Sequence, residues 1–366
     1  MSRSTLLRHG LLALGAAAVL VALTYVLDPF RDYQLGTAAA YLCATAGLTV
    51  LTGQNGQLSL GHGALMAVGA YTVALAQNAF SAHGVSTQWT LGVSVAGGVL
   101  AASVAGAVIG IAAARLRGPY LAGLTLVVAI AVPAVSTVFG SVFHGDQGLP
   151  VYLLPAPDAL GVDFPFERWQ AWLALAAALL TMLLLANLTT SRFGRTMRAV
   201  RDDEAAARLA GVSVARTQVL AFVVSAACAG LGGAMFAVLA QSVSPSAFAL
   251  TLSLNLLLAI VVGGLGSLAG AVWGSLLLVL LPWLIDTVTG GLTLSPALRQ
   301  RLAGNLPLAL FGLLLIVVMV AAPGGIQGLL DRAGRWARGR RHGRPARRAD
   351  PLAQDAEPPA PAATHI

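Results

Sequence analysis

The sequence predicts an all-α, polytopic integral membrane protein with about ten transmembrane helices, some of them short or broken. Of its 366 residues, 57% are hydrophobic and 10% are charged, and the mean hydropathy is +0.80. An average soluble domain has about 25% charged residues, so this chain has too little charge to cover a surface that faces water. The chain also contains many apolar stretches of the roughly 20 residues that a membrane-spanning helix needs.

Ten apolar segments are candidate spans. The first follows Arg3 and Arg8 as the apolar part of a signal peptide would, but no small-x-small cleavage site follows it, so we expect a retained span. The third opens with polar residues, and the eighth is short and ends in glycines. In chain order the segments are 10–27, 34–52, 57–76, 90–113, 118–141, 170–189, 217–241, 250–266, 269–289 and 305–322.

The placement of arginine predicts the orientation, because cytoplasmic loops carry an excess of basic residues. With the N-terminus inside and ten crossings, the outer loops hold only four of the 22 basic residues, and the inner loops and termini hold the rest. The four are Arg31, Arg168, Arg299 and Arg301. We therefore expect both termini in the cytosol, with an inside loop at 190–216 and an outside loop at 142–169.

Residues 1–331 form the predicted transmembrane domain, and residues 332–366 form a cytosolic tail that is first rich in arginine and then in alanine and proline. The tail cannot bury a core, so we expect it to be disordered. Its arginines favour anionic membrane lipid, by about 1 kcal/mol each near the surface. Aromatic residues other than Trp336 are missing between them, which argues against a nucleic-acid partner.

The composition excludes several kinds of site. All 22 basic residues are arginine, so the chain lacks the lysine of a standard P-loop ATPase or a pyridoxal Schiff base. No carboxylate pair, nucleophile–base set or metal-ligand spacing is visible, so we expect neither an enzyme nor a cofactor in this chain. The spans contain almost no ionisable groups, which argues against a proton- or sodium-coupled carrier. Active transport would then need energy from another polypeptide.

A few polar residues within the spans are candidates to line a translocation path or its inner gate. Three of them begin the third segment, where the backbone N–H groups of a helix start are also unpaired. The alternative is that these side chains satisfy helix ends and bonds between helices. The candidates are Gln57, Ser59, His62, Tyr120, Thr125 and Asn255.

Glycines cluster before the third segment and around the eighth and ninth. We expect them to permit a break in a helix or close helix packing, and not to bind phosphate. Stretches 56–61 and 264–270 are loosely alike, and related broken segments in two halves can mark a transport site. Composition alone also explains the likeness. The glycines are Gly56, Gly61, Gly263, Gly264, Gly266 and Gly270.

The inside loop at 190–216 predicts a short helix. Asp202 or Asp203 can cap it, alanines favour it, and Gly211 can end it in a left-handed turn. Such a helix can lie in a groove of another protein. The alternative is a solvated loop whose arginines only set the topology. The candidate docking residues are Arg201, Asp202, Asp203, Glu204, Ala205, Ala206 and Gly211.

At these residues the chain resembles a known family. Glu204-Ala205-Ala206, followed by Gly211, is similar to the EAA loop of ABC importer permeases, which docks on the ATPase subunit; the spacing to the glycine is one residue longer than in the commonest version. Four stretches in order resemble the branched-chain amino-acid ABC transporter permease family, LivM branch. They are 56–62, 194–236, 263–270 and 322–326. The likeness covers about residues 36–330.

The resemblance implies a permease subunit in a bacterial inner membrane that forms the pathway for branched-chain, hydrophobic amino acids. It also implies two ATP-binding subunits that hold the ATP, a second, LivH-like permease and a periplasmic or extracellular solute-binding protein. An importer of the same type for urea or short amides is an alternative. A passive carrier or channel, and a membrane scaffold, are alternatives of other classes. Whether the membrane unit is a heterodimer or a homodimer is open.

Overall fold

The structure is a computed structural model, and it divides into two units, residues 1–328 and residues 329–366. It describes residues 3–85, 88–116, 118–152, 156–157, 160–161, 164–290, 306, 309–310, 312–314, 316–318, 320, 322 and 324–341. Within these residues, eight helices are long and apolar enough to cross a membrane, and a shorter apolar helix covers Gly10–Val26. The polytopic all-α class is thus confirmed, and seven of the 18 residues of the predicted span at 305–322 lie outside the described residues.

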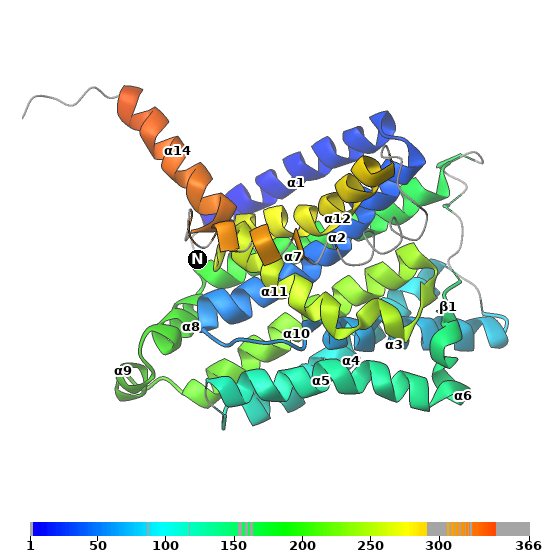
Figure 1. Ribbon diagram of the computed structural model, residues 1–366, viewed down its shortest axis with the longest axis horizontal. Helices are drawn as coiled ribbons and strands as arrows, with labels where there is room; N and C mark the ends of the chain where they lie inside the picture. The colour runs from blue at the N-terminus through cyan, green and yellow to red at the C-terminus, as the bar shows by residue number, and fades with distance from the viewer. Residues whose placement is uncertain are drawn as a thin grey trace, which may run out of the picture. The chain divides into compact units, whose positions relative to one another are not determined.

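The order of the helices along the chain can be followed by colour in Figure 1. The first part of the chain forms α1 (Arg3–Val26), α2 (Pro29–Thr49), a π-helical turn (Val50–Gln54), α3 (His62–Ala82), α4 (Gln88–Ala113) and α5 (Pro119–Val138). The middle part forms α6 (Gly140–Phe143), a 3-10 turn (Gly145–Gln147), β1 (Leu149–Pro150), α7 (Phe166–Thr190), α8 (Arg192–Asp202) and α9 (Glu204–Leu209). The last part forms α10 (Val214–Ala240), β2 (Ser242–Val243), a 3-10 turn (Pro245–Phe248), α11 (Leu250–Gly264), α12 (Leu268–Gly290) and α14 (Gly325–Arg341).

Helix α10 is the central helix, because α2, α3, α4 and α7 all pack against it. Three glycines on α10 make this possible. A Cβ at Gly230 would collide with α4, one at Gly232 with the backbone of α2, and one at Gly233 with the backbone of α3. Lipid is as apolar as the helix surfaces, so close packing through small residues is a main source of association between helices.

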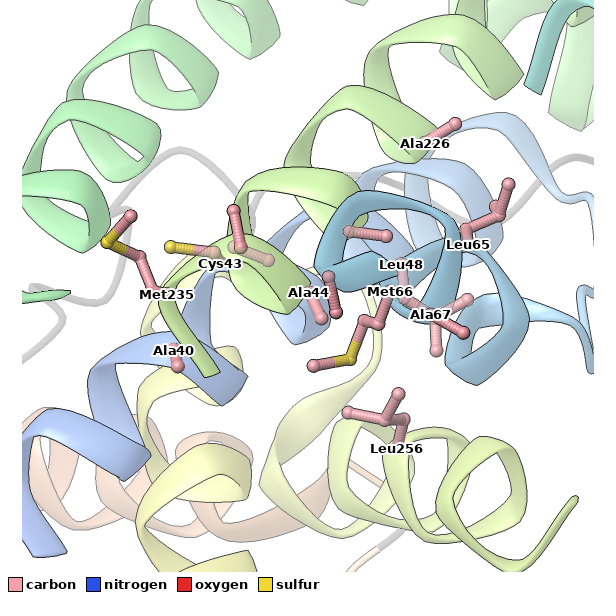
Figure 2. Packing of buried hydrophobic residues seen from close by; sticks show 14 of the residues in the cluster. Ala40, Cys43, Ala44, Leu48, Leu65, Met66, Ala67, Ala226, Met235 and Leu256 are labelled. Carbon is pink, nitrogen blue, oxygen red and sulfur yellow. The ribbon is translucent and has the colours of Figure 1, made fainter. Parts of the chain in front are cut away.

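The buried core lies where α2, α3, α10 and α11 meet, and alanine supplies much of it. Small side chains let the backbones of these helices approach closely, which brings polar groups on neighbouring helices within hydrogen-bond distance. Figure 2 shows side chains of this core: Ala40, Cys43, Ala44 and Leu48 from α2, Leu65, Met66 and Ala67 from α3, Ala226 and Met235 from α10, and Leu256 from α11.

The loops separate to two ends of the bundle, with α8 and α9 at the left of Figure 1 and β1 and α6 at the right. At the second end, β1 pairs with β2 in antiparallel register, and Asn78 Nδ2 donates to the Pro150 carbonyl at 2.7 Å. At the first end, Arg201 of α8 bonds the Gly53 carbonyl, and Gln54 bonds the Gly266 carbonyl. The predicted inside loops at 53–56, 190–216 and 267–268 therefore meet at one end of the bundle, and β1, from the predicted outside loop at 142–169, lies at the other (Figure 1).

The third predicted span differs from the structure at both ends. It was expected at 57–76, but α3 runs from His62 to Ala82, and residues 56–61 are not helical. The positive φ of +75° at Gly56 turns the chain out of the helix. Thr52 Oγ1 donates to the Gln57 carbonyl and Ser59 Oγ accepts from Gly61 N, so side chains bond backbone groups that no longer belong to a helix.

Helix α14 continues into the segment expected to be disordered, since residues 332–341 are helical. Arginine and alanine, which fill much of this stretch, both favour helix. Residues 342–366 lie outside the described residues.

Candidate functional site

The chain leaves helical form after Asn55 and resumes it at His62. We call residues 55–61, from this last helical residue to Gly61, the unwound segment. Side chains alternate along it as in an extended strand. Asn55, Gln57 and Ser59 are buried, whereas Gly56 and Leu58 are exposed. The segment follows a π-helical turn, and such turns are frequent at functional sites.

The unwound segment places the start of α3 deep in the membrane layer. His62, the first residue of α3, contacts Ser225, which lies eleven residues after the start of α10 at Val214. At 1.5 Å per residue this is about 16 Å along α10, near the middle of a hydrocarbon layer of about 30 Å. Irregular backbone at this depth is tolerated only inside protein or beside a water-filled cavity.

Hydroxyl groups of two other helices satisfy backbone N–H groups of this region. Leu60 N donates to Thr125 Oγ1 of α5 at 3.0 Å, and Gly63 N donates to Ser253 Oγ of α11 at 3.0 Å. Both hydroxyls are buried. The unwound segment and the first turn of α3 are thus bonded to α5 and α11.

A third helix is bonded through histidine. His62 Nε2 lies 2.7 Å from Ser225 Oγ of α10, and His62 Nδ1 lies 3.1 Å from Ser59 Oγ. His62 and Ser225 are fully buried, and Ser59 is 1% exposed. This chain of hydrogen bonds joins the unwound segment and the start of α3 to α10.

The structure brings four of the six candidate path residues together and leaves two apart. Gln57 lies in the same segment as Ser59, close to His62, and its Oε1 accepts from Asn55 Nδ2 at 2.8 Å. Thr125 bonds Leu60 of that segment. Tyr120 is 76% exposed at the start of α5. Asn255 is half-buried on α11, and its Oδ1 has no hydrogen-bond partner among the described residues.

Sequence reasoning did not single out Ser225 and Ser253. Each is a lone hydroxyl in an apolar span, and most such hydroxyls bond a carbonyl of their own helix. Ser225 lies inside one of the stretches that carry the family resemblance, which is the only signal that points to it.

The second part of the candidate site is residues 191–211, which we call the docking segment. Helix α9 has the predicted form, with Asp203 as its cap. Asp203 Oδ1 accepts from Ala205 N at 2.8 Å and from Ala206 N at 3.1 Å. Gly211 follows with φ of +80°, a left-handed conformation that favours glycine.

Helix α9 is bonded to the bundle on one side and open on the other. Glu204 Oε1 accepts from Gln218 Nε2 of α10 at 3.0 Å, and Ala207 is buried. Ala205 and Ala206 are exposed, and Leu209 is 91% exposed at the end of the bundle where the arginines lie. Within the described residues, this face of α9 is therefore left uncovered.

The candidate docking residue Arg201 is exposed on α8, yet its guanidinium group bonds the bundle. Its Nη1 donates to the Gly53 carbonyl at 2.6 Å, and its Nη2 pairs with Asp202 Oδ1 at 2.8 Å. On the same helix, Arg198 Nη1 donates to Gln54 Oε1 at 3.0 Å. The structure therefore leaves the candidates Ala205 and Ala206 exposed on α9, whereas the candidate Arg201 on α8 bonds the bundle.

A cavity of about 540 Å³ lies between the unwound segment and the docking segment. Its wall includes Asn55, Gln57, Leu58, Arg201, Glu204 and Gln218. Two buried atoms in this wall, Asn55 Oδ1 and Gln57 Nε2, have no hydrogen-bond partner among the described residues. The cavity therefore lies against both parts of the candidate site.

The candidate glycines have the geometry of a helix break with close packing. Gly264 and Gly266, with φ of +130° and +83°, turn the chain from α11 into α12. A Cβ at Gly263 would collide with the Gly270 carbonyl. On the other break, a Cβ at Gly61 would lie 2.9 Å from the Thr125 carbonyl.

Metal binding has no candidate in the described part of the chain, where no three His, Cys, Asp or Glu side chains gather.

Comparison with known proteins bears on both halves of the site. The family model for "Branched-chain amino acid transport system / permease component" matches residues 30–323, which include the unwound segment, the docking segment and the glycine break. Comparison with solved structures gives no match.

Curated relatives are transport permeases. The high-affinity branched-chain amino acid transport system permease protein LivM of Escherichia coli is 32% identical over 262 residues, 65% of this chain and 60% of the relative. LivH of Salmonella typhimurium is 25% identical over 70% of this chain and 84% of its own length. The autoinducer 2 import system permease protein LsrC of Klebsiella pneumoniae is 34% identical over 49% of this chain and 59% of its own length. The chain spans about 60% of the length of the LivM relatives it matches.

Proposed function

We propose that this chain, which belongs to the branched-chain amino acid transport system permease family, is a membrane-spanning subunit of an ATP-driven importer. The observation that carries the proposal is α9. It is a capped, exposed helix with Leu209 projecting from it, and its Glu204 is bonded to α10, which contributes Ser225 to the bonds around the unwound segment. A protein that binds α9 could therefore act on the interior of the bundle.

The proposed partners are two ATP-binding subunits, a second, LivH-like permease and an external solute-binding protein. Relatives named LivM and LivH both align with this chain, and their names describe components of one kind of transport system. ATP would bind to the partner subunits and no cofactor to this chain, which has no lysine for a standard P-loop. The chain would supply the pathway and no catalysis.

The unwound segment is the proposed gate. Hydroxyls of Thr125, Ser225 and Ser253 join it and the start of α3 to three helices, and this network is buried. Substrate can pass only when some of these bonds break and the helices separate. The cavity beside Gln57 would be the inner vestibule that receives the substrate.

The proposed substrates are branched-chain amino acids. The interior is mostly alanine, valine and leucine, which suits an aliphatic side chain. Urea or short amides are the second candidates for an importer of this type, and the similarity to LsrC shows that relatives with other named substrates align with this sequence. A passive carrier or channel is the candidate of a different class.

Purification from the native host in mild detergent, followed by mass spectrometry and uptake in proteoliposomes, tests the proposal. We expect P-loop ATPases and a second permease to accompany the chain, and uptake of leucine, isoleucine and valine to need ATP and the solute-binding protein. Uptake by the chain alone, without ATP, would establish the passive carrier instead. ATP-dependent uptake of urea with no uptake of leucine would overturn the proposed substrate and retain the importer.

A further inference from the structure

Helix α8 joins the docking segment to the transmembrane helices through two arginines. Its buried face consists of Gly194, Met197 and Val200. Arg198 and Arg201 flank this face, and both guanidinium groups donate to the bundle. Neither arginine belongs to the exposed face of α9 that the proposed function assigns to the ATPase.

Both arginines satisfy carbonyls at the ends of helices. Arg201 Nη1 donates to the Gly53 carbonyl at 2.6 Å, in the π-helical turn that ends α2, and Arg198 Nη1 donates to the Thr189 carbonyl at 3.1 Å, in the last turn of α7. The last carbonyls of a helix have no partner within the helix, and the helix dipole favours a cation there. Hydrogen bonds with a charged donor are stronger than neutral ones, so α8 is firmly attached to α2 and α7.

Gln54 extends this attachment to the other helix break. Its Oε1 accepts from Arg198 at 3.0 Å, and its Nε2 donates to the Gly266 carbonyl at 2.8 Å. The backbones of Gly53 and Gly266 also pack closely, because a Cβ at Gly53 would collide with the Gly266 backbone. One glutamine thus connects α8, the end of α2 and the turn between α11 and α12.

The attachment lies directly beside the unwound segment. Gly53 and Gln54 are followed at once by residues 55–61, and the Arg201 side chain packs on Gly56, where a Cβ would lie 2.7 Å from Arg201 Cγ. A displacement of α8 must therefore either move the first residues of the unwound segment with it or break the hydrogen bonds of the arginines. Only a few rotatable side-chain bonds therefore connect the docking segment to the proposed gate.

We propose that Arg198, Arg201 and Gln54 are positioning residues that transmit movement of the docking segment to the unwound segment and to the Gly264–Gly266 turn. The proposal rests on the proposed function. In it, α9 binds the ATPase, while these three side chains couple the bound ATPase to the gate. Their loss therefore separates ATP hydrolysis from transport and leaves assembly intact.

The test uses the complete complex, with its ATPase subunits and second permease, in proteoliposomes supplied with the solute-binding protein. Arg201→Ala, Arg198→Ala and Gln54→Leu are compared with Arg192→Ala, which removes the same charge from an exposed position on the same helix. Three quantities are measured: ATPase subunit recovered per chain, ATP hydrolysis, and substrate taken up per ATP hydrolysed.

We expect the three variants to recover ATPase subunits as the wild type does, and uptake per ATP to fall about tenfold, as loss of a charge-assisted bond allows. Arg201→Lys, which keeps a cation and a donor, restores part of the ratio. Arg192→Ala leaves all three quantities unchanged. Gln54→Leu keeps both arginines, so it decides the matter if an arginine variant does not accumulate in the membrane.

Two results would overturn the inference alone: an unchanged ratio in all three variants, or a loss of ATPase recovery in proportion to uptake, which would make the arginines docking residues. Failure of the wild-type chain to recover any ATPase would instead overturn the proposed function. The two failures are therefore distinguishable.

Discussion

Single residues set how closely α3 and α10 approach. A Cβ at Gly233 would overlap the Met66 carbonyl, and one at Gly69 would overlap the Gly230 carbonyl. In each case the obstacle is backbone, which cannot rotate away as a side chain can. The position of α3, and with it the start of α3 at His62, therefore depends on the absence of two side chains.

The matched pair Gly233→Ala and Gly123→Ala tests this dependence. Gly233→Ala must force the helices apart, and overpacking of this kind costs about 1–3 kcal/mol. Gly123 on α5 has no atom within 4 Å of an added Cβ, so its replacement should be neutral or slightly stabilising. Thermal unfolding in mild detergent measures the unfolding temperature of both variants. Equal unfolding temperatures for the two variants would show that the bundle has room at Gly233.

A buried ion pair acts at the opposite end of the bundle. Arg168 Nε lies 3.3 Å from Asp32 Oδ2, and the Asp32 side chain is fully buried. We expect Arg168→Ala to destabilise the fold by about 3 kcal/mol, because it leaves a buried charge without its partner. Adding Asp32→Leu should restore much of this loss. Thermal unfolding in mild detergent measures the stability of both variants. If the double variant were no more stable than Arg168→Ala alone, the argument would be contradicted.

At the scale of elements, local sequence signals predicted the features that depend only on neighbouring residues. Asp203, the alanines and Gly211 indicated a short capped helix, and α9 has that form. The start of α3 was predicted five residues too early, because an apolar window cannot detect a break that depends on Gly56 and on bonds to other helices. Partners such as Ser225 for His62 and Arg201 for Gly53, which are 163 and 148 residues apart, follow from packing and have no local signature.

The cap of α9 gives a prediction at this scale. A helix of six residues is too short to persist without a cap or tertiary contacts, and loss of an aspartate cap costs about 1 kcal/mol. Asp203→Ala should therefore lower recovery of the ATPase subunit several-fold, and Asp203→Asn, which keeps an acceptor, should restore it. Co-purification from the same host measures this. Full recovery with Asp203→Ala would mean that α9 does not need to be preformed.

At the scale of the whole molecule, the arrangement of loops agrees with the charge pattern. The loops at 53–56, 190–216 and 267–268, expected on one side, lie at one end of the bundle, where Arg198, Arg201 and Gln54 connect them. The sequence could predict which loops share a side, because arginine counts report it. It could not predict which loops touch, because that depends on the tilt and packing of helices.

Which end faces the cytosol is the remaining prediction at this scale, and labelling of single cysteines tests it. The two native cysteines, Cys43 and Cys228, are in the core or packed against it, and both can be replaced by alanine. Arg208→Cys marks the docking segment, and Gln147→Cys marks the opposite end; both positions are exposed. Because arginine-rich loops stay in the cytosol, a membrane-impermeant thiol reagent should label Gln147→Cys in intact cells and Arg208→Cys only after permeabilisation. The reverse pattern would place α9 outside, where no ATP-hydrolysing subunit could bind it, and the importer proposal would fail together with the orientation.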